Sequence, residues 1–155
     1  MGLGPVILYM LISSGTHFQH FIPTFNTCRI IDTWGVFMGR IRDTFLKLER
    51  SGECAFIAYL MAGDPDPVQT PRIATAIARY ADILELGIPF SDPIADGKTI
   101  QAASERALRA GMTPKKIFEH VAAIRRETEI PIVVMSYYNP IVQFGVDRFM
   151  NRFAL

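Results

Sequence analysis

The sequence predicts an α/β protein built from parallel βαβ units. Short apolar runs alternate with segments whose apolar residues recur at helical spacing, from residue 38 onward. The apolar runs are nearly continuous, which is typical of parallel strands covered on both faces. With 155 residues, 50% of them hydrophobic, the chain is long enough for one core. Two architectures fit these units, an open doubly wound sheet and a (β/α)8 barrel.

The regular pattern begins with a helix that starts at Met38, in which Ile41, Phe45 and Leu48 share one face. Residues 1–37 show little periodicity. We expect residues 1–37 to be a non-homologous N-terminal extension, either disordered or upstream sequence read in frame, and residues 38–155 to form the barrel-type domain. A targeting or interaction extension is the alternative.

An apolar run opens the extension, from Pro5 to Ile12. It is too short to span a bilayer. No Lys or Arg precedes it, so it lacks the charged start of a secretory signal.

The pattern after the first helix predicts three strands and four helices. The strands are expected at residues 55–61, 82–88 and 130–137, and the helices at 67–80, 99–110, 113–126 and from 146 onward. Pro71 suggests that the regular part of the second helix begins near that residue. No Gly-x-Gly-x-x-Gly motif follows the first strand, which weakens a dinucleotide-binding interpretation.

Charge and cysteine content narrow the function classes. A formal net charge of +1 gives no support for binding to nucleic acid or to an anionic membrane. Cys28 and Cys54 suggest no disulfide framework and form no familiar metal-ligand pattern with the three histidines. Two free thiols fit a reducing compartment, so we expect a cytoplasmic protein.

The candidate site lies in the run LELGIPFSDPIADG, residues 84–97. Glu85 sits inside an apolar strand, and Asp92 and Asp96 follow in a loop rich in Pro and Gly. Side chains alternate along a strand, so Glu85 faces away from its two leucine neighbours. In a barrel the leucines face the helices and Glu85 faces inward, where desolvation raises its pKa. Such a group suits proton transfer near neutral pH, although a structural acid paired with a donor remains an alternative.

The loop residues have structural and functional interpretations of similar weight. Ser91 and Asp92 can hydrogen-bond to their own turn. Asp96 precedes Gly97 and a predicted helix, so it is either an N-cap or an acceptor for a ligand N–H. These carboxylates lie at the carboxyl end of a strand, where both candidate architectures bind ligands.

The run at residues 84–97 resembles the signature of the tryptophan synthase α subunit family. Further similarity lies in AFIAYLMAGDPDP (55–67), ASERALRAGMTP (103–114) and VVMSYYNPIVQFGVDRF (133–149). The resemblance extends from about Met38 to the end of the chain. It implies a (β/α)8 barrel that cleaves indole-3-glycerol phosphate to indole and glyceraldehyde 3-phosphate by a retro-aldol reaction. It also implies that this reaction needs no cofactor.

Matching the family's motifs residue by residue implies specific roles. The family's catalytic glutamate matches Glu85, which transfers protons that include the one at indole C3. Its catalytic aspartate matches Asp96, which holds the indole N–H and stabilises the positive charge on the ring. Substrate-lining aromatics match Tyr59 and Tyr137.

The same match implies a partner. In the family, indole passes through a tunnel to a β subunit that uses pyridoxal phosphate, in an assembly of two α and two β chains. The loop from Pro89 to Asp96 corresponds to part of the surface that faces the β subunit, with Asp92 and Pro93 as the expected contacts.

Three departures from the family pattern bear on function. Only three of the eight strands of such a barrel, which takes about 250 residues, are predicted here. The later loops that bind phosphate are therefore missing, and the chain alone is expected to be inactive with an open apolar sheet edge. Lys98 replaces the usual Pro, and the turn Arg79–Asp82 lacks the usual Gly. A non-catalytic half-barrel that at most binds the β subunit is thus the main alternative, and a different phosphate-sugar lyase is a weaker one.

Overall fold

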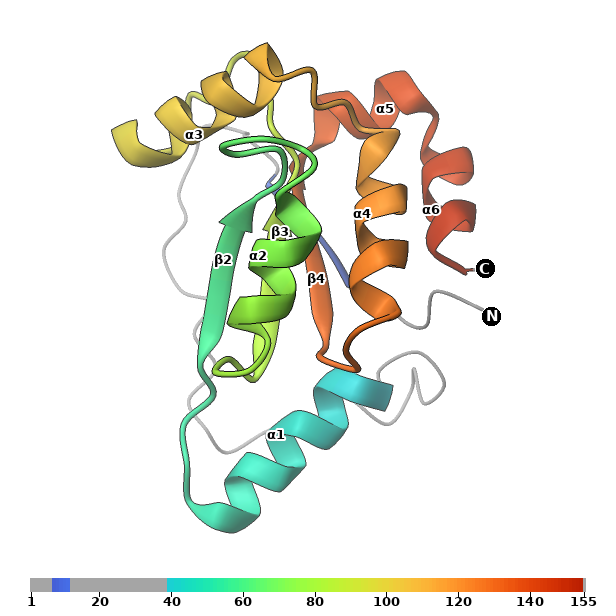
Figure 1. Cartoon of the computed structure of the whole chain (residues 1–155). Helices are drawn as coiled ribbons and strands as arrows, with labels where there is room; N and C mark the ends of the chain where they lie inside the picture. Colours follow the sequence, from blue (N-terminus) through green and yellow to red (C-terminus); the bar gives the residue numbers. More distant parts are fainter. Residues whose placement is uncertain (1–6, 12–38, 155) are drawn as a thin grey trace.

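The computed structural model describes residues 7–11 and 39–154, and these contain one parallel four-stranded sheet (Figure 1). The strand order is β1-β4-β3-β2, with β1 at Ile7–Leu11, β2 at Ile57–Met61, β3 at Ile83–Gly87 and β4 at Ile132–Tyr137. The register places Glu85 of β3 beside Tyr59 of β2 and Val133 of β4. The three predicted strands are therefore confirmed, each a few residues shorter than expected.

Six helices accompany the sheet in the described part of the chain: α1 (Gly39–Ser51), α2 (Thr70–Ile77), α3 (Lys98–Arg109), α4 (Lys116–Arg125), α5 (Tyr138–Phe144) and α6 (Val146–Ala154). Helices α2 and α4 pack together over one face of the sheet (Figure 1). Helix α1 lies at the end where the strands begin, and α3 lies at the end where they finish (Figure 1). Each crossover from β2 to β3 and from β3 to β4 thus contains helix, as the parallel order requires.

Three helices differ from the prediction. Helix α2 spans Thr70–Ile77 rather than 67–80, and it begins beside Pro71 as expected for its regular part. Helix α5 was not predicted, because it follows β4 directly and has too few residues to show a helical period. Helix α4 begins at Lys116 rather than just after Thr113. The Lys116 N–H donates to the Thr113 carbonyl at 3.0 Å, so residues 113–116 form a turn before the regular helix.

The ends of α2 and α3 confirm two details read from the sequence. Gly111 follows α3 with a φ of 80°, the left-handed conformation that ends many helices. Helix α2 has no such glycine, and its C-cap Ala78 keeps a φ of −58°. The chain instead turns through residues 79–82, where the carboxylate of Asp82 accepts the Phe56 N–H at 2.8 Å.

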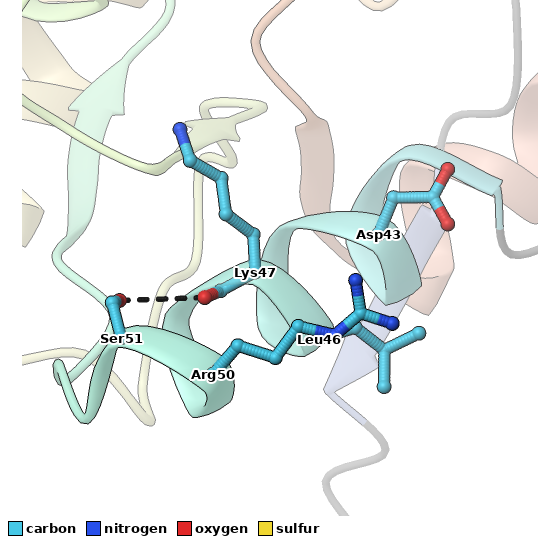
Figure 2. Close-up of a pocket in the computed structure, with 5 residues that line it drawn as sticks. All are labelled: Asp43, Leu46, Lys47, Arg50 and Ser51. Carbon is cyan, nitrogen blue, oxygen red and sulfur yellow. Dashed lines mark hydrogen bonds between the residues drawn. The ribbon is translucent and has the colours of Figure 1, made fainter.

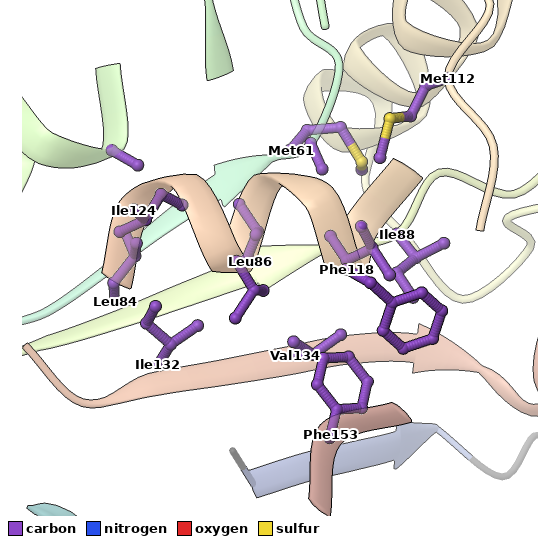
Figure 3. Packing of buried hydrophobic residues seen from close by; sticks show 14 of the residues in the cluster. Met61, Leu84, Leu86, Ile88, Met112, Phe118, Ile124, Ile132, Val134 and Phe153 are labelled. Carbon is purple, nitrogen blue, oxygen red and sulfur yellow. The ribbon is translucent and has the colours of Figure 1, made fainter. Parts of the chain in front are cut away.

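The hydrophobic core lies between the sheet and its covering helices (Figure 3). Leu84 and Leu86 of β3 are fully buried there, as are Ile132 and Val134 of β4. Phe118 of α4 extends this core toward α5 and α6, where it contacts the rings of Phe144, Phe149 and Phe153 at centroid distances of 4.7–5.5 Å. The predicted outward orientation of the two β3 leucines is therefore confirmed.

Most of the N-terminal extension, residues 1–6 and 12–37, lies outside the described residues, as does Met38. The expected nature of residues 1–37 stays a prediction, although Ile7–Leu11 form β1. Among the described helices, none has the length and apolar character needed to cross a membrane.

The core makes a direct stability prediction at Ile132, which is fully buried on β4. Replacing Ile132 with Ala should lower the free energy of unfolding by about 2–5 kcal/mol, because a cavity forms where the side chain packed. Ile94 is 79% exposed, so Ile94→Ala is the matched control and should change stability by less than about 0.5 kcal/mol. Urea denaturation followed by circular dichroism measures both. Equal effects at the two positions would contradict this core.

Candidate active site

Glu85 lies on the face of β3 opposite its leucine neighbours, as the period of two predicts. Its side chain is half-buried, and this desolvation raises the pKa of its carboxyl group. The register places Glu85 directly beside Tyr59, so an acid and a phenol meet on neighbouring strands. A carboxyl group with a raised pKa retains its proton closer to neutral pH, which suits a group that both gives and takes a proton.

Tyr59 reaches across β3 through a space left by Gly87. A Cβ at residue 87 would lie 2.1 Å from the Tyr59 hydroxyl oxygen, so a side chain there would displace the phenol ring. Burial raises the pKa of Tyr59, and the charges of Asp96 and Glu85 raise it further. The phenol of Tyr59 therefore lies within electrostatic reach of each of the two carboxylates.

Asp96 ends the loop that follows β3 and is half-buried. Helix α3 has Gly97 as its N-cap, without a side-chain capping bond, so Asp96 does not cap the helix. Desolvation raises the pKa of Asp96, and a hydrogen bond with the Tyr137 hydroxyl opposes that rise. The sequence left two roles for Asp96, helix N-cap and acceptor for a ligand N–H. The structure excludes the first of them.

Helix α3 holds this loop through two polar side chains. Ser104 accepts the Phe90 N–H and donates to the Phe90 carbonyl, both at 2.9 Å. The Gln101 side-chain amide donates to the Asp96 carbonyl at 2.9 Å and to the Pro93 carbonyl at 3.3 Å. Both ends of the loop are therefore tied to α3, which restricts where the Asp96 carboxylate lies.

Tyr137, at the end of β4, holds the same loop from the other side. Its hydroxyl accepts the Ala95 N–H at 3.0 Å, next to its hydrogen bond with Asp96. Its ring packs against Phe90 with a centroid distance of 5.1 Å. Tyr137 is therefore a loop anchor as well as a candidate substrate-lining residue.

The sequence prediction missed Ser104 and Gln101. Ser104 is 1% exposed and lies on the face of α3 that buries Ala103 and Ala107. A polar residue among small apolar ones on a buried helix face was the available signal, since buried hydroxyls are normally hydrogen-bonded. Nothing local, however, indicated that its partner is the backbone of Phe90.

A second loop at this end of the sheet is also tied to α3. Asp64, in the turn after β2, forms two hydrogen bonds with Arg106, from Nε at 2.7 Å and from an Nη at 2.8 Å. Such a bidentate pair fixes the orientation of both groups. Helix α3 thus positions the turns that follow both β2 and β3.

Asp92 and Pro93 lie at the outer part of the loop. Asp92 is exposed and accepts a hydrogen bond from the Ser91 hydroxyl, while Pro93 is half-buried. The neighbouring Ile94 is 79% exposed. Lys98 is the first residue of α3 and is also exposed. This part of the loop is therefore exposed and contributes no group to the cluster of carboxyl and phenol groups.

The four candidate residues Tyr59, Glu85, Asp96 and Tyr137 meet at the carboxyl end of the sheet, beside the loop. Desolvation raises the pKa of both carboxyl groups, and only Asp96 has an opposing hydrogen bond, with Tyr137. The cluster combines two carboxyl groups with two phenol rings.

Figure 2 shows a pocket elsewhere, lined by Asp43, Leu46, Lys47, Arg50 and Ser51. All five residues belong to α1, and the Ser51 hydroxyl already donates to the Lys47 carbonyl at 3.3 Å. None of the candidate site residues lines it. The pocket therefore carries no argument for a second reactive centre.

The raised pKa of Glu85 predicts a pH-dependent stability. The folded chain holds this proton more tightly than the unfolded chain, whose Glu has a pKa of about 4.3. The stabilisation is present below that value and is lost as pH rises through the folded pKa. Glu85→Gln should therefore gain stability relative to the parent between pH 4 and pH 7.

Urea titrations of parent and variant across this range measure the difference. Glu127→Gln is the matched control, because Glu127 is exposed near the end of α4, and its difference from the parent should stay flat. A Glu85→Gln difference that also stays flat would contradict a buried, proton-retaining Glu85.

Comparison with known proteins gives one consistent result. The profile of the family "Tryptophan synthase alpha chain" matches residues 45–155. The tryptophan synthase alpha chain of Geotalea daltonii is 50% identical over 115 residues, which cover 74% of this chain and 44% of the relative. That of Carboxydothermus hydrogenoformans is 48% identical over 118 residues, covering 76% and 44%.

Solved structures agree with the sequence relatives. The chain superimposes on tryptophan synthase subunit alpha from Legionella pneumophila with a TM-score of 0.70 at 38% identity, covering 74% of this chain and 44% of that one. For the Pyrococcus furiosus α-subunit the TM-score is 0.62 at 50% identity, covering 63% and 40%. The chain spans less than half the length of the relatives it matches, and the alternating strands and helices are part of a (β/α)8 barrel. The protein belongs to the tryptophan synthase alpha chain family.

Proposed function

We propose that this chain carries the catalytic acid pair for cleavage of indole-3-glycerol phosphate to indole and glyceraldehyde 3-phosphate, the α reaction of tryptophan synthase. The observation that supports this most strongly is that Tyr59 lies beside Glu85 in the sheet and within electrostatic reach of both Asp96 and Tyr137. Family membership supports the choice of substrate. The reaction is a carbon–carbon lyase step and takes no cofactor.

Glu85 acts at indole C3. Cleavage of the bond between C3 and the glycerol phosphate chain requires a proton at C3, and the half-buried Glu85 carboxyl is placed to deliver it. Desolvation keeps the pKa of this group above its ordinary value, so a protonated fraction persists toward neutral pH. The same group, once ionised, takes up the proton that the substrate hydroxyl releases as the carbonyl product forms.

Asp96 acts at the indole nitrogen. When C3 gains a proton, the ring nitrogen becomes positively charged and its N–H becomes a stronger donor. A carboxylate at that position accepts the N–H and stabilises the charge. Desolvation raises the pKa of Asp96 as it raises that of Glu85, and a hydrogen bond with Tyr137 opposes this rise at Asp96, so Asp96 has a support for its ionised form that Glu85 lacks.

The two tyrosines have different supporting roles. Tyr59 presents its ring beside Glu85, where it lines the indole position and excludes water. Tyr137 holds Ala95 and Asp96 through its hydroxyl while its ring packs against Phe90. Tyr137 is therefore a positioning residue for Asp96 in addition to lining the site.

The partner in this proposal is a tryptophan synthase β subunit, which holds pyridoxal phosphate and receives the indole. The exposed outer part of the loop, with Asp92, Pro93 and the apolar side chain of Ile94, supplies part of the contact surface. The assembly is that of a cytoplasmic biosynthetic enzyme.

A second candidate is a non-catalytic half-barrel that only binds the β subunit. It is favoured by one fact: the chain matches 44% of the length of its relative, so the strands and loops that bind the phosphate in such barrels lie outside the match. We accordingly propose that the 155-residue chain does not release indole by itself.

The catalytic proposal is tested in a completed barrel. Residues 38–155 would replace the matching part of the Geotalea daltonii alpha chain, and indole release from indole-3-glycerol phosphate would be measured. Glu85→Gln and Asp96→Asn should each lower turnover by about 10²–10⁴-fold while circular dichroism stays unchanged, because each removes one acid–base or charge-stabilising group. Asp92→Asn is the control in the same loop and should retain turnover.

The outcomes separate the two candidates. An active chimera that loses activity on Glu85→Gln supports the catalytic role. A folded chimera without activity favours the half-barrel, and a fully active Glu85→Gln chimera removes Glu85 from proton transfer. Indole release by the isolated 155-residue chain would contradict its proposed inactivity.

The partner surface predicts a loss of affinity on loop substitution. Titration of a purified tryptophan synthase β subunit with this chain, followed by calorimetry, should show binding. Asp92→Lys combined with Pro93→Ala should weaken it at least about tenfold, or 1.4 kcal/mol, because both residues contact the partner. Glu127→Lys, near the end of α4 and far from the loop, should leave the affinity unchanged. Equal losses in both variants would contradict the assignment.

A further inference from the structure

The loop that carries Asp96 ends in a tight turn at residues 93–96. The Asp96 N–H donates to the Pro93 carbonyl at 3.1 Å, which closes this turn. The Gln101 side-chain amide donates to the same Pro93 carbonyl at 3.3 Å and to the Asp96 carbonyl at 2.9 Å. One side chain of α3 therefore bridges the first and last residues of the turn.

The start of α3 places Gln101 for this contact. Its backbone N–H donates to the carbonyl of Gly97, the N-cap residue, at 3.0 Å, which is the bond that opens the helix. With its backbone fixed there, the side chain reaches back along the helix to the turn. Gln101 is exposed, so its side chain contributes little to the core. Substitution of an exposed residue usually changes stability little, which allows its effect on Asp96 to be measured in a folded chain.

Tyr137 holds the same turn from β4. Its hydroxyl accepts the Ala95 N–H at 3.0 Å and hydrogen-bonds to the Asp96 carboxylate. Tyr137 is 7% exposed and lies at the end of a strand, so its position does not follow the loop. The hydrogen bond between the phenol and the carboxylate therefore depends on the turn keeping its place beside β4.

We propose that Gln101 is a positioning residue for Asp96, whose carboxylate it keeps within reach of the Tyr137 hydroxyl by bridging the turn at residues 93–96. Both backbone polar groups of Asp96 are hydrogen-bonded in this arrangement, the N–H to Pro93 and the carbonyl to Gln101. With both groups held, the carboxylate moves only by rotation about its own side-chain bonds. The consequence for catalysis rests on the proposed α reaction, in which a fixed acceptor meets the indole N–H. The positioning itself does not rest on that reaction.

An NMR titration of the side-chain carboxyl of Asp96 in the 155-residue chain tests the positioning. Among the described residues, Tyr59 on β2 and Tyr137 on β4 interact electrostatically with this carboxylate. The pKa of each phenol is raised, so neither changes charge while Asp96 titrates. Gln101→Met removes the amide donors and keeps the side-chain length and helix propensity. It should raise the Asp96 midpoint by about 0.5 pH unit, because the hydrogen bond that favours the ionised form weakens.

Two further variants identify the route. Gln143→Met makes the same chemical change at an exposed position of α5 and should leave the Asp96 midpoint where it is. Tyr137→Phe alone should raise the midpoint, and adding Gln101→Met to it should raise it no further. Additive shifts would contradict action through Tyr137. An unchanged midpoint in Gln101→Met would overturn the positioning role.

Amide hydrogen exchange separates this role from a general loosening of α3. The Ser104 hydroxyl, on the same helix, accepts the Phe90 N–H at the other end of the loop. In Gln101→Met the N–H groups of Ala95 and Asp96 should exchange at least about threefold faster, while the Phe90 N–H keeps its rate. Equal acceleration of all three N–H groups would show that the whole helix has loosened and would overturn the proposal.

The completed barrel tests the catalytic consequence. There Gln101→Met should lower the rate of indole release by about tenfold, and it should move the acid limb of the pH–rate profile upward together with the Asp96 midpoint. An active chimera whose rate and profile are unchanged by Gln101→Met would overturn this consequence. An inactive parent chimera would instead count against the proposed function alone, because the titration and the exchange rates of the 155-residue chain decide the positioning without turnover.

Discussion

The burial of Leu84 and Leu86 against the helices determines where Glu85 lies. Both leucines are fully buried, and burial of each side chain stabilises the fold by about 1.5–3 kcal/mol. Strand β3 is paired on both edges, so it cannot rotate independently of the sheet. A shift of the strand register by one residue would expose both leucines and bury the Glu85 carboxylate on the helix-facing side. The lost apolar burial and the burial of a charge would both destabilise the fold. The burial of the two leucines on one face of β3 thus determines that the Glu85 side chain lies on the other face.

A comparable constraint acts on Asp96, but through hydrogen bonds instead of apolar packing. The loop between β3 and α3 has exposed residues and little core of its own. Its backbone is held by Ser104, Gln101 and Tyr137, which together contact residues near both its ends. Ser104 is buried, so its replacement leaves the Phe90 N–H and carbonyl without their partner, a cost of about 1–3 kcal/mol for each group that water does not reach. The acid on the strand and the acid on the loop are therefore positioned by different parts of the molecule, which meet at Tyr137.

Local sequence patterns predicted the elements whose causes are local. The continuous apolar runs predicted β2, β3 and β4, the period of two predicted the orientation of Glu85, and Gly111 marked the end of α3. The sequence missed elements that are too short to show a period and residues whose partners lie far along the chain. Helix α5 is an example of the first kind. Ser104 is an example of the second kind, because it hydrogen-bonds to the Phe90 backbone fourteen residues earlier. The place of Ile7–Leu11 beside β4 depends on pairing across more than a hundred residues, which no local pattern encodes.

The edge of β4 and the candidate site are physically connected through one residue. Leu11, the last residue of β1, is the register partner of Tyr137, and Tyr137 accepts the Ala95 N–H and hydrogen-bonds to Asp96. A strand that pairs with this end of β4 limits the movement of the Tyr137 backbone, because the pairing of β4 with β3 ends at Met135 and does not reach Tyr137. Whichever strand occupies the edge therefore borders the residue that holds the Asp96 loop. In this structure that strand is β1, so the backbone of Tyr137 pairs with a segment that lies before the residues matched by the family profile.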